Sequence, residues 1–139
     1  TEGKIFISVR KSDRLPAVEI ARKLAELGFT LYATRGTASA LFEAGLEVIS
    51  VNKVTEGRPH IVDMIKNNEI NLIINTVGDK RSAVQDSYSI RHAVLQARVT
   101  YFTTLAGARA ACIGMANIRE LKVYDLQKLH KLIESESPH

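Results

Sequence analysis

The sequence has little of what builds disulfides, thiolate metal sites or membrane spans. A single cysteine, Cys112, excludes an internal disulfide and suits a reducing compartment. No apolar run approaches the roughly 18 to 20 residues that a membrane-spanning helix needs, and the N-terminal residues carry no signal-peptide cleavage pattern. We therefore expect a cytoplasmic protein without membrane contact.

The chain also lacks the motifs of several enzyme classes. It contains neither the G-x-x-x-x-G-K-[ST] loop of ATP-binding proteins nor the G-x-G-x-x-G loop of dinucleotide-binding proteins. Its 4 histidines do not stand at metal-ligand spacing, and no Ser-His-Asp or Cys-His arrangement stands out. We therefore predict no catalytic residue, no metal and no resident cofactor in this chain.

Charge and length limit the remaining possibilities. The net charge is +4, but the 19 lysines and arginines are scattered, and no basic run is interleaved with the few aromatic residues. This distribution favours binding of one small anion over binding of nucleic acid. A length of 139 residues fits a single domain, residues 1–139, with one core.

Strand-like and helix-like segments alternate along the whole chain. Amphipathic or small-residue helical segments follow each strand-like run, and the apolar run Leu72 to Ile74 is typical of a strand covered on both faces. The alternation predicts an α/β fold with a parallel sheet between two layers of helices. Strands are expected at Lys4–Val9, Phe29–Ala33, Glu47–Val51, Asn71–Asn75 and Val99–Thr103, with a short strand at Leu121–Tyr124 and a tail helix after it.

The best candidate for a binding loop is Thr34-Arg35-Gly36-Thr37, between the second strand and the second helix. Ligands of open α/β sheets bind at the carboxyl ends of the strands. A glycine at a helix entry lets an anion approach the unpaired first amides, and threonine hydroxyls add donors. The alternative is that Thr37 only caps its helix and Gly36 only turns the chain.

Neighbouring loops supply further polar groups. Arg14 and Lys53 are expected in solvent-facing loops, where they either meet the phosphate or are simply solvated. Asn75 ends the most apolar strand, so its amide either faces a sugar or base, or bonds its own turn. Convergence of these groups at one end of one sheet favours the binding interpretation.

Several of these segments resemble a known family. The segments FTLYATRGT, AGLEVISVNKVTEGRPHI and NLIINT look like the methylglyoxal-synthase-like fold. Within that fold, NKVTEGRPHI and DSYSIRHAVLQARVTYFTTLAG are similar to the C-terminal allosteric domain of the carbamoyl phosphate synthetase large subunit. The resemblance covers Gly3 to Ile133 and implies a three-layer α/β/α sandwich around a five-stranded, mostly parallel sheet.

The resemblance also implies a role. The domain would be a non-catalytic fragment of a longer chain and would regulate a glutamine-hydrolysing ligase of pyrimidine and arginine biosynthesis. Its effector would be UMP or IMP, and ATP and a divalent metal would be used in other domains. Its partners would be the synthetase domains of the same chain and, through them, the glutaminase small subunit.

Matched position by position, the family's site falls on ten residues of this sequence. Arg14 stands where the family pattern has lysine, and Val77 where it has threonine, which leaves the choice of effector open. Tyr101 has a plain alternative, which is to cover the sheet. The resemblance assigns the effector phosphate to Ser8, Arg14, Thr34, Gly36, Thr37 and Lys53, the nucleoside to Asn75 and Val77, and the ornithine side to Tyr101 and Thr103.

Two other functions compete with this one. A methylglyoxal synthase acting on dihydroxyacetone phosphate needs a carboxylate base, expected as Gly-Gly-Asp after the third strand. This sequence has Thr55-Glu56-Gly57-Arg58 there, which disfavours that activity. A free-standing nucleotide-binding protein remains an open alternative.

Overall fold

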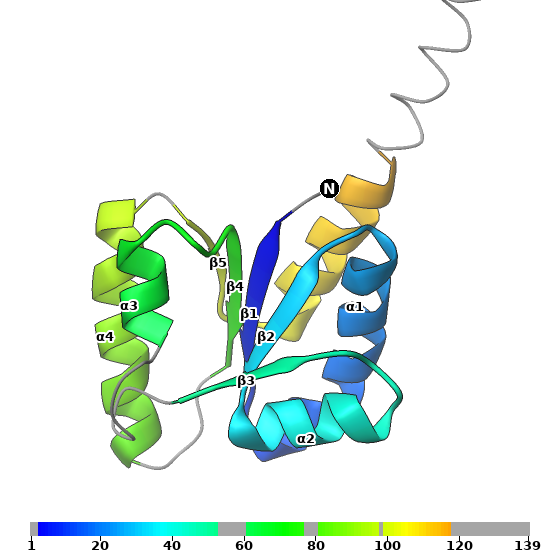
Figure 1. Ribbon diagram of the computed structural model, residues 1–139, viewed down its shortest axis with the longest axis horizontal. Coiled ribbons are helices and arrows are strands. Elements are labelled where there is room, and N and C mark those ends of the chain that lie inside the picture. Colours follow the sequence, from blue (N-terminus) through cyan, green and yellow to red (C-terminus); the bar gives the residue numbers. More distant parts are fainter. Residues whose placement is uncertain (1–2, 53–60, 77–80, 98, 118–139) are drawn as a thin grey trace, which may run out of the picture.

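The chain folds around one parallel β-sheet (Figure 1). The structure, a computed structural model, describes residues 3–52, 61–76, 81–97 and 99–117. In this part the strand order is β3-β2-β1-β4-β5, and every neighbouring pair is parallel, as the sequence predicted. The strands are β1 (Lys4–Ser8), β2 (Thr30–Thr34), β3 (Ile49–Val51), β4 (Leu72–Asn75) and β5 (Thr100–Phe102).

Helices cover both faces of the sheet, which confirms the expected three-layer α/β/α arrangement (Figure 1). One face carries α1 (Arg14–Glu26), α2 (Arg35–Glu43) and a helix over residues 105–117. The other face carries α3 (Ile61–Lys66) and α4 (Arg81–Ala97).

Alternating side chains of the central strands build the two halves of the core. From β1, Ile5 and Ile7 pack with α1 and α2, whereas Phe6 packs with α3 and α4. The same alternation in β4 sends Ile74 to the first half and Ile73 to the second. All five side chains are at most 1% exposed, because helices exclude water from both faces.

Two glycines end helices α1 and α2. Gly28 has a φ of 99° and Gly45 a φ of 86°, which lie in the left-handed region that ends a helix at low cost only with glycine. The end of α2 receives one further donor, since a terminal nitrogen of Arg22 lies 3.2 Å from the carbonyl oxygen of Ala44. These stops set where β2 begins and how α2 turns toward β3.

The first strand ends one residue earlier than predicted, and helix α1 begins where the chain leaves a 3-10 turn. The first strand stops at Ser8, because the amide of Val9 donates to the Thr37 hydroxyl. Helix α1 begins at Arg14, after a 3-10 turn, η1 (Lys11–Asp13), and the Asp13 side chain forms no capping bond. Its carboxylate instead accepts a hydrogen bond from Arg10.

Other boundaries differ by one or two residues. The third strand begins at Ile49 rather than Glu47, and the fifth spans Thr100–Phe102 rather than Val99–Thr103. The predicted strand Leu121–Tyr124 and the tail helix lie outside the described residues. Within the described part of the chain, no helix combines the length and apolarity that a membrane span requires.

We predict that Gly45→Ala destabilises the fold by about 1–2 kcal/mol, the cost of a left-handed conformation for a residue with a β-carbon. Nothing lies within 4 Å of a β-carbon built at this position, so the cost is purely conformational. Gly114→Ala is the matched control, because Gly114 lies in the helix over residues 105–117 with equally open space. Urea unfolding should show Gly45→Ala less stable and Gly114→Ala at least as stable as the parent protein.

Candidate functional site

The carboxyl ends of all described strands lie at one edge of the sheet, because the strands are parallel (Figure 1). From β1 the chain proceeds to β2 and β3 on one side, and later to β4 and β5 on the other. The strand order therefore reverses between β1 and β4, the place where open α/β sheets bind ligands. Ser8 at the end of β1 is in register with Asn75 at the end of β4, so both predicted site residues lie at this edge.

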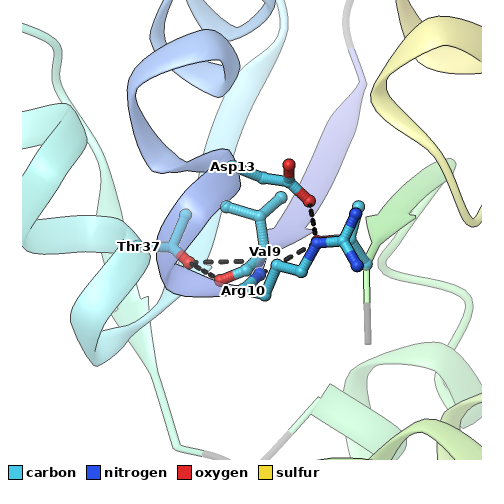
Figure 2. A network of polar contacts seen from close by, with 5 residues as sticks. Val9, Arg10, Asp13 and Thr37 are labelled. Carbon is cyan, nitrogen blue, oxygen red and sulfur yellow. Dashed lines mark hydrogen bonds and ion pairs between the residues drawn. The ribbon is translucent and has the colours of Figure 1, made fainter. Parts of the chain in front are cut away.

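Ser8, Thr34 and Thr37 form a hydroxyl cluster between β1, β2 and the first turn of α2. The Oγ1 of Thr34 lies 3.3 Å from Oγ of Ser8 and 3.4 Å from Oγ1 of Thr37. Thr37 is 1% exposed, and its Oγ1 accepts a hydrogen bond of 3.2 Å from the amide of Val9 (Figure 2). Thr37 therefore ties the end of β1 to α2, and the interpretation of Thr37 as a simple cap is wrong. The N-cap residue is Thr34, whose side chain forms no capping bond either.

Arg14 lies against Gly36. A β-carbon built at Gly36 would lie 2.8 Å from Cζ of Arg14 and closer still to a terminal nitrogen, so the guanidinium uses the space that the glycine leaves. The expectation of a solvent-facing loop was wrong for Arg14, which is the first residue of α1 and is half-buried. Its Nε is fully buried and has no hydrogen-bond partner among the described residues. A buried donor in this state is uncommon and costly.

Asn75 and Tyr101 are joined across β4 and β5. The Nδ2 of Asn75 donates a hydrogen bond of 2.9 Å to the hydroxyl oxygen of Tyr101. Asn75 is only 3% exposed, and the half-buried Tyr101 ring packs against the core half beside α3 and α4. The guanidinium of Arg91 lies 5.9 Å from the centroid of that ring. Tyr101 thus covers the sheet with its ring and bonds Asn75 with its hydroxyl, while Thr103 is exposed just beyond β5.

Comparison with known proteins identifies the family. The model of a family described as "MGS-like domain" matches residues 16–103, which is more than half of the chain. The chain belongs to the MGS-like domain family. The match begins at Pro16, inside α1, and includes α2 with Thr37 and all of β2 to β5, whereas Ser8 and Arg14 lie before it.

Individual relatives carry one shared name. This MGS-like domain is 55% identical over 129 residues to "Carbamoyl phosphate synthase large chain" of Ralstonia nicotianae, which covers 93% of this chain and 12% of the relative. It is 50% identical over 135 residues to the protein of that name from Pseudomonas aeruginosa, covering 97% of this chain and 12% of the relative. The chain thus spans about an eighth of the length of these curated relatives.

A solved structure shares the fold. The methylglyoxal synthase from Elizabethkingia anophelis NUHP1 superposes with a TM-score of 0.63 at 20% sequence identity. The superposition covers 80% of this chain and 77% of that structure. At this identity the likeness shows the α/β architecture alone, not the activity.

Two residues at the carboxyl edge of the sheet, Arg10 and Thr76, were not among the site residues predicted from the sequence. The Oγ1 of Thr76 accepts a hydrogen bond of 2.9 Å from the amide of Arg10, and the amide of Thr76 donates one of 3.0 Å to the carbonyl oxygen of Ser8. The available signal was the position of Thr76 directly after Asn75, at the end of the most apolar strand. Lys53 and Val77, and the loop that holds Glu56, lie outside the described residues.

Cys112 is a core residue. It is 2% exposed and packs in the half of the core beside α1 and α2. Burial raises the pKa of its thiol, against a smaller opposing effect of Lys23. Among the described residues, no group of three or more His, Cys, Asp or Glu side chains is placed to hold a metal ion.

We predict that Thr37→Val destabilises the MGS-like domain by about 1–3 kcal/mol, because the buried amide of Val9 loses its acceptor. Valine matches threonine in shape, so little packing changes. Thr37→Ser is the matched control, since it keeps the hydroxyl and loses one methyl group, worth about 0.8 kcal/mol or less. Urea unfolding curves measure the stability of both variants. A valine variant more stable than the serine variant would show that this hydrogen bond does not stabilise the fold.

Proposed function

We propose that this MGS-like domain is the allosteric regulatory domain of a carbamoyl phosphate synthase large chain, and that it binds a nucleoside monophosphate at the edge formed by β1, β2 and α2. The relatives that share this name, and the small fraction of their length that the chain spans, support assignment of the domain to one part of such a longer protein. UMP or IMP is the proposed effector. The ligase activity, its ATP and its divalent metal belong to other domains of that protein.

The observation that carries the proposal is the state of Arg14. Its Nε is buried without a partner among the described residues, and its guanidinium lies at the first turn of α2. A buried, unpaired donor costs about 1–3 kcal/mol, more when it is charged, unless something pairs with it. A phosphate oxygen would do so, because arginine and phosphate match in charge and in planar, two-pronged geometry.

Helix α2 adds donors beside Arg14. Its N-cap residue Thr34 makes no side-chain capping bond, so the first amides of the helix are not satisfied by that side chain. These amides carry the positive end of the helix dipole, which favours an anion. Gly36, in the first turn, presents no side chain of its own in front of them.

The hydroxyl cluster would complete the phosphate site. Thr34 is placed to donate to Oγ of Ser8, and that arrangement leaves the proton of the Ser8 hydroxyl for another acceptor. Ser8 is half-buried at the end of β1, beside the carboxyl edge. We propose that Lys53 supplies a second cation, and that Asn75 and the residue after Thr76, Val77, lie at the nucleoside end.

Tyr101 and Thr103 form the proposed ornithine side, completed by the synthetase domains of the longer chain. The Tyr101 hydroxyl accepts from Asn75 and keeps its own proton for a ligand. The same bond joins this side to the proposed nucleoside end. The glutaminase small subunit would be reached only through the rest of the large chain.

We predict that Arg14→Met lowers the affinity for UMP, IMP or inorganic phosphate about ten- to a hundredfold, since a charge-assisted contact of about 1.5–3 kcal/mol is lost. The fold should be no less stable, because the variant removes a buried donor without a partner. Arg109→Met is the control: Arg109 lies on the helix over residues 105–117, 3.9 Å from Glu19, and loses the same charge. Calorimetric titration measures affinity, and thermal unfolding measures stability.

Two results would contradict the proposed function. Ligand at a hundredfold excess over its Kd would add about 2.7 kcal/mol to the free energy of unfolding. If saturating UMP, IMP, ornithine and phosphate all leave the melting temperature unchanged, no effector site of this kind exists. If the domain forms methylglyoxal from dihydroxyacetone phosphate above the uncatalysed background, it is a synthase instead.

We predict that Gly36→Ala weakens phosphate binding about as much as Arg14→Met while leaving stability within about 0.5 kcal/mol of the parent. The new methyl group would overlap the Arg14 guanidinium, which is the flexible end of a side chain and can swing away. The phosphate would thereby lose its cation without loss of the arginine. The double variant Gly36→Ala, Arg14→Met tests this directly: its affinity should equal that of either single variant, and additive losses would show that Gly36 acts separately.

A further inference from the structure

We propose that Arg10 is a further ligand-binding residue, directed at the nucleoside end of the effector, and that Asp13 is the residue that positions it. This inference rests on the proposed function and adds to it a group that distinguishes a whole nucleotide from its phosphate.

Arg10 is anchored on the opposite side of β1 from Arg14. Its amide donates to Oγ1 of Thr76, whose own amide donates to the carbonyl oxygen of Ser8, so the Arg10 backbone is fixed to the end of β4. Figure 2 shows its side chain directed away from Thr37. Arg14, by contrast, lies against Gly36 of α2. Two arginines four positions apart thus diverge toward the two sides of the point where the strand order reverses.

Asp13 holds the Arg10 guanidinium by its inner nitrogen. The Nε of Arg10 donates to Oδ2 of Asp13 at 2.7 Å, and the amide of Asp13 donates to the carbonyl oxygen of Arg10 at 2.9 Å (Figure 2). The Asp13 side chain is 18% exposed and that of Arg10 is 54% exposed. The carboxylate is therefore the sheltered anchor, and the guanidinium is the part that reaches solvent.

This geometry leaves the outer half of the guanidinium for a ligand. Arginine has five N–H donors in a fixed plane, and the bond to Asp13 uses the one on Nε. The donors on the two terminal nitrogens have no partner among the described residues and form a fork that suits two acceptors. Orientation by Asp13 lowers the entropy that the fork loses when it binds.

The Asp13 carboxylate bonds Arg10 and does not cap helix α1. Asp13 is the N-cap residue of α1, a position where aspartate usually accepts an amide hydrogen bond from the first turn. Its side chain makes no such bond: the φ of −99° and ψ of −2° of Asp13 are helical rather than the extended values usual for an N-cap, and its carboxylate bonds Arg10. An ion pair with a half-exposed partner contributes little to stability, so orientation of Arg10 gives the arrangement a purpose that stability does not.

The ligand chemistry follows from the two arginines. A phosphate held by Arg14 and α2 leaves the remainder of a nucleoside monophosphate to extend toward β4, where Arg10 and Asn75 lie. Ribose hydroxyls and base carbonyls are acceptors that the Arg10 fork can bind. Inorganic phosphate, held at the Arg14 end, would not reach it.

The test is the ratio of affinities for UMP or IMP and for inorganic phosphate, measured by calorimetric titration. Arg10→Met should lower nucleotide affinity about tenfold or more and phosphate affinity less than about twofold. Arg14→Met, the matched control, should lower both. Asp13→Ala should also lower the ratio of nucleotide affinity to phosphate affinity, by a smaller factor than Arg10→Met. Asp13→Asn keeps an acceptor for Arg10, so its ratio should lie between those of Asp13→Ala and the parent protein.

Each other outcome overturns the inference. An equal loss for nucleotide and phosphate in Arg10→Met would mean a general charge effect, and no loss for either would mean a surface ion pair without a role in binding. Arg10→Lys keeps the charge but not the two-pronged guanidinium, so it should also lower the ratio of nucleotide affinity to phosphate affinity. This variant replaces Arg10→Met in the test if the methionine variant fails to fold. Wild-type protein that binds none of these ligands would overturn the proposed function itself.

Discussion

The bond between the Thr37 hydroxyl and the amide of Val9 fixes the end of β1 to the first turn of α2. It is buried, it joins residues 28 positions apart, and it ends the strand where the loop toward α1 begins. The direction of that loop sets where Arg10 and Arg14 emerge, on either side of the strand. Without the bond, the buried Val9 amide would lose its acceptor. The hydroxyl cluster would also lose its link, through Thr37, between the end of β1 and helix α2.

The apolar layers make this edge rigid enough to hold polar groups at fixed separations. Ile5, Phe6 and Ile7 anchor β1 from both faces, so the strand end cannot shift without disturbing two halves of the core. Polar groups placed on the ends of such strands hold their geometry better than groups on free loops. Such strand ends can therefore present an ordered set of donors.

A row of polar side chains lies along the edge in two separate hydrogen-bonded groups. Thr37, Thr34 and Ser8 occupy the side of β1 and β2, and Asn75 and Tyr101 the side of β4 and β5. Ser8 and Asn75 are register partners, so the two groups meet at the centre of the sheet. If an effector at one end and a second ligand at the other both act on this row, each must change the affinity for the other by the same factor.

The sequence alone determined the layout of the fold. Consecutive apolar residues in Leu72 to Ile74 required helices on both faces, and Gly28 and Gly45 marked the ends of two helices, because these signals are local. Local signals also placed Thr34, Gly36 and Asn75 at strand ends or helix starts. The contribution of Lys53 and Val77 to the site stays a prediction.

Only the tertiary structure decided what those residues touch. The partners of Val9, Arg10 and Asn75 lie 28, 66 and 26 positions away, and a residue pattern does not contain the strand order that brings them together. The same is true of Arg14, a loop cation by its sequence, which is half-buried because Gly36 of another helix leaves room for it. Periodicity specifies which face of an element is apolar, whereas packing of distant segments fixes which polar groups meet.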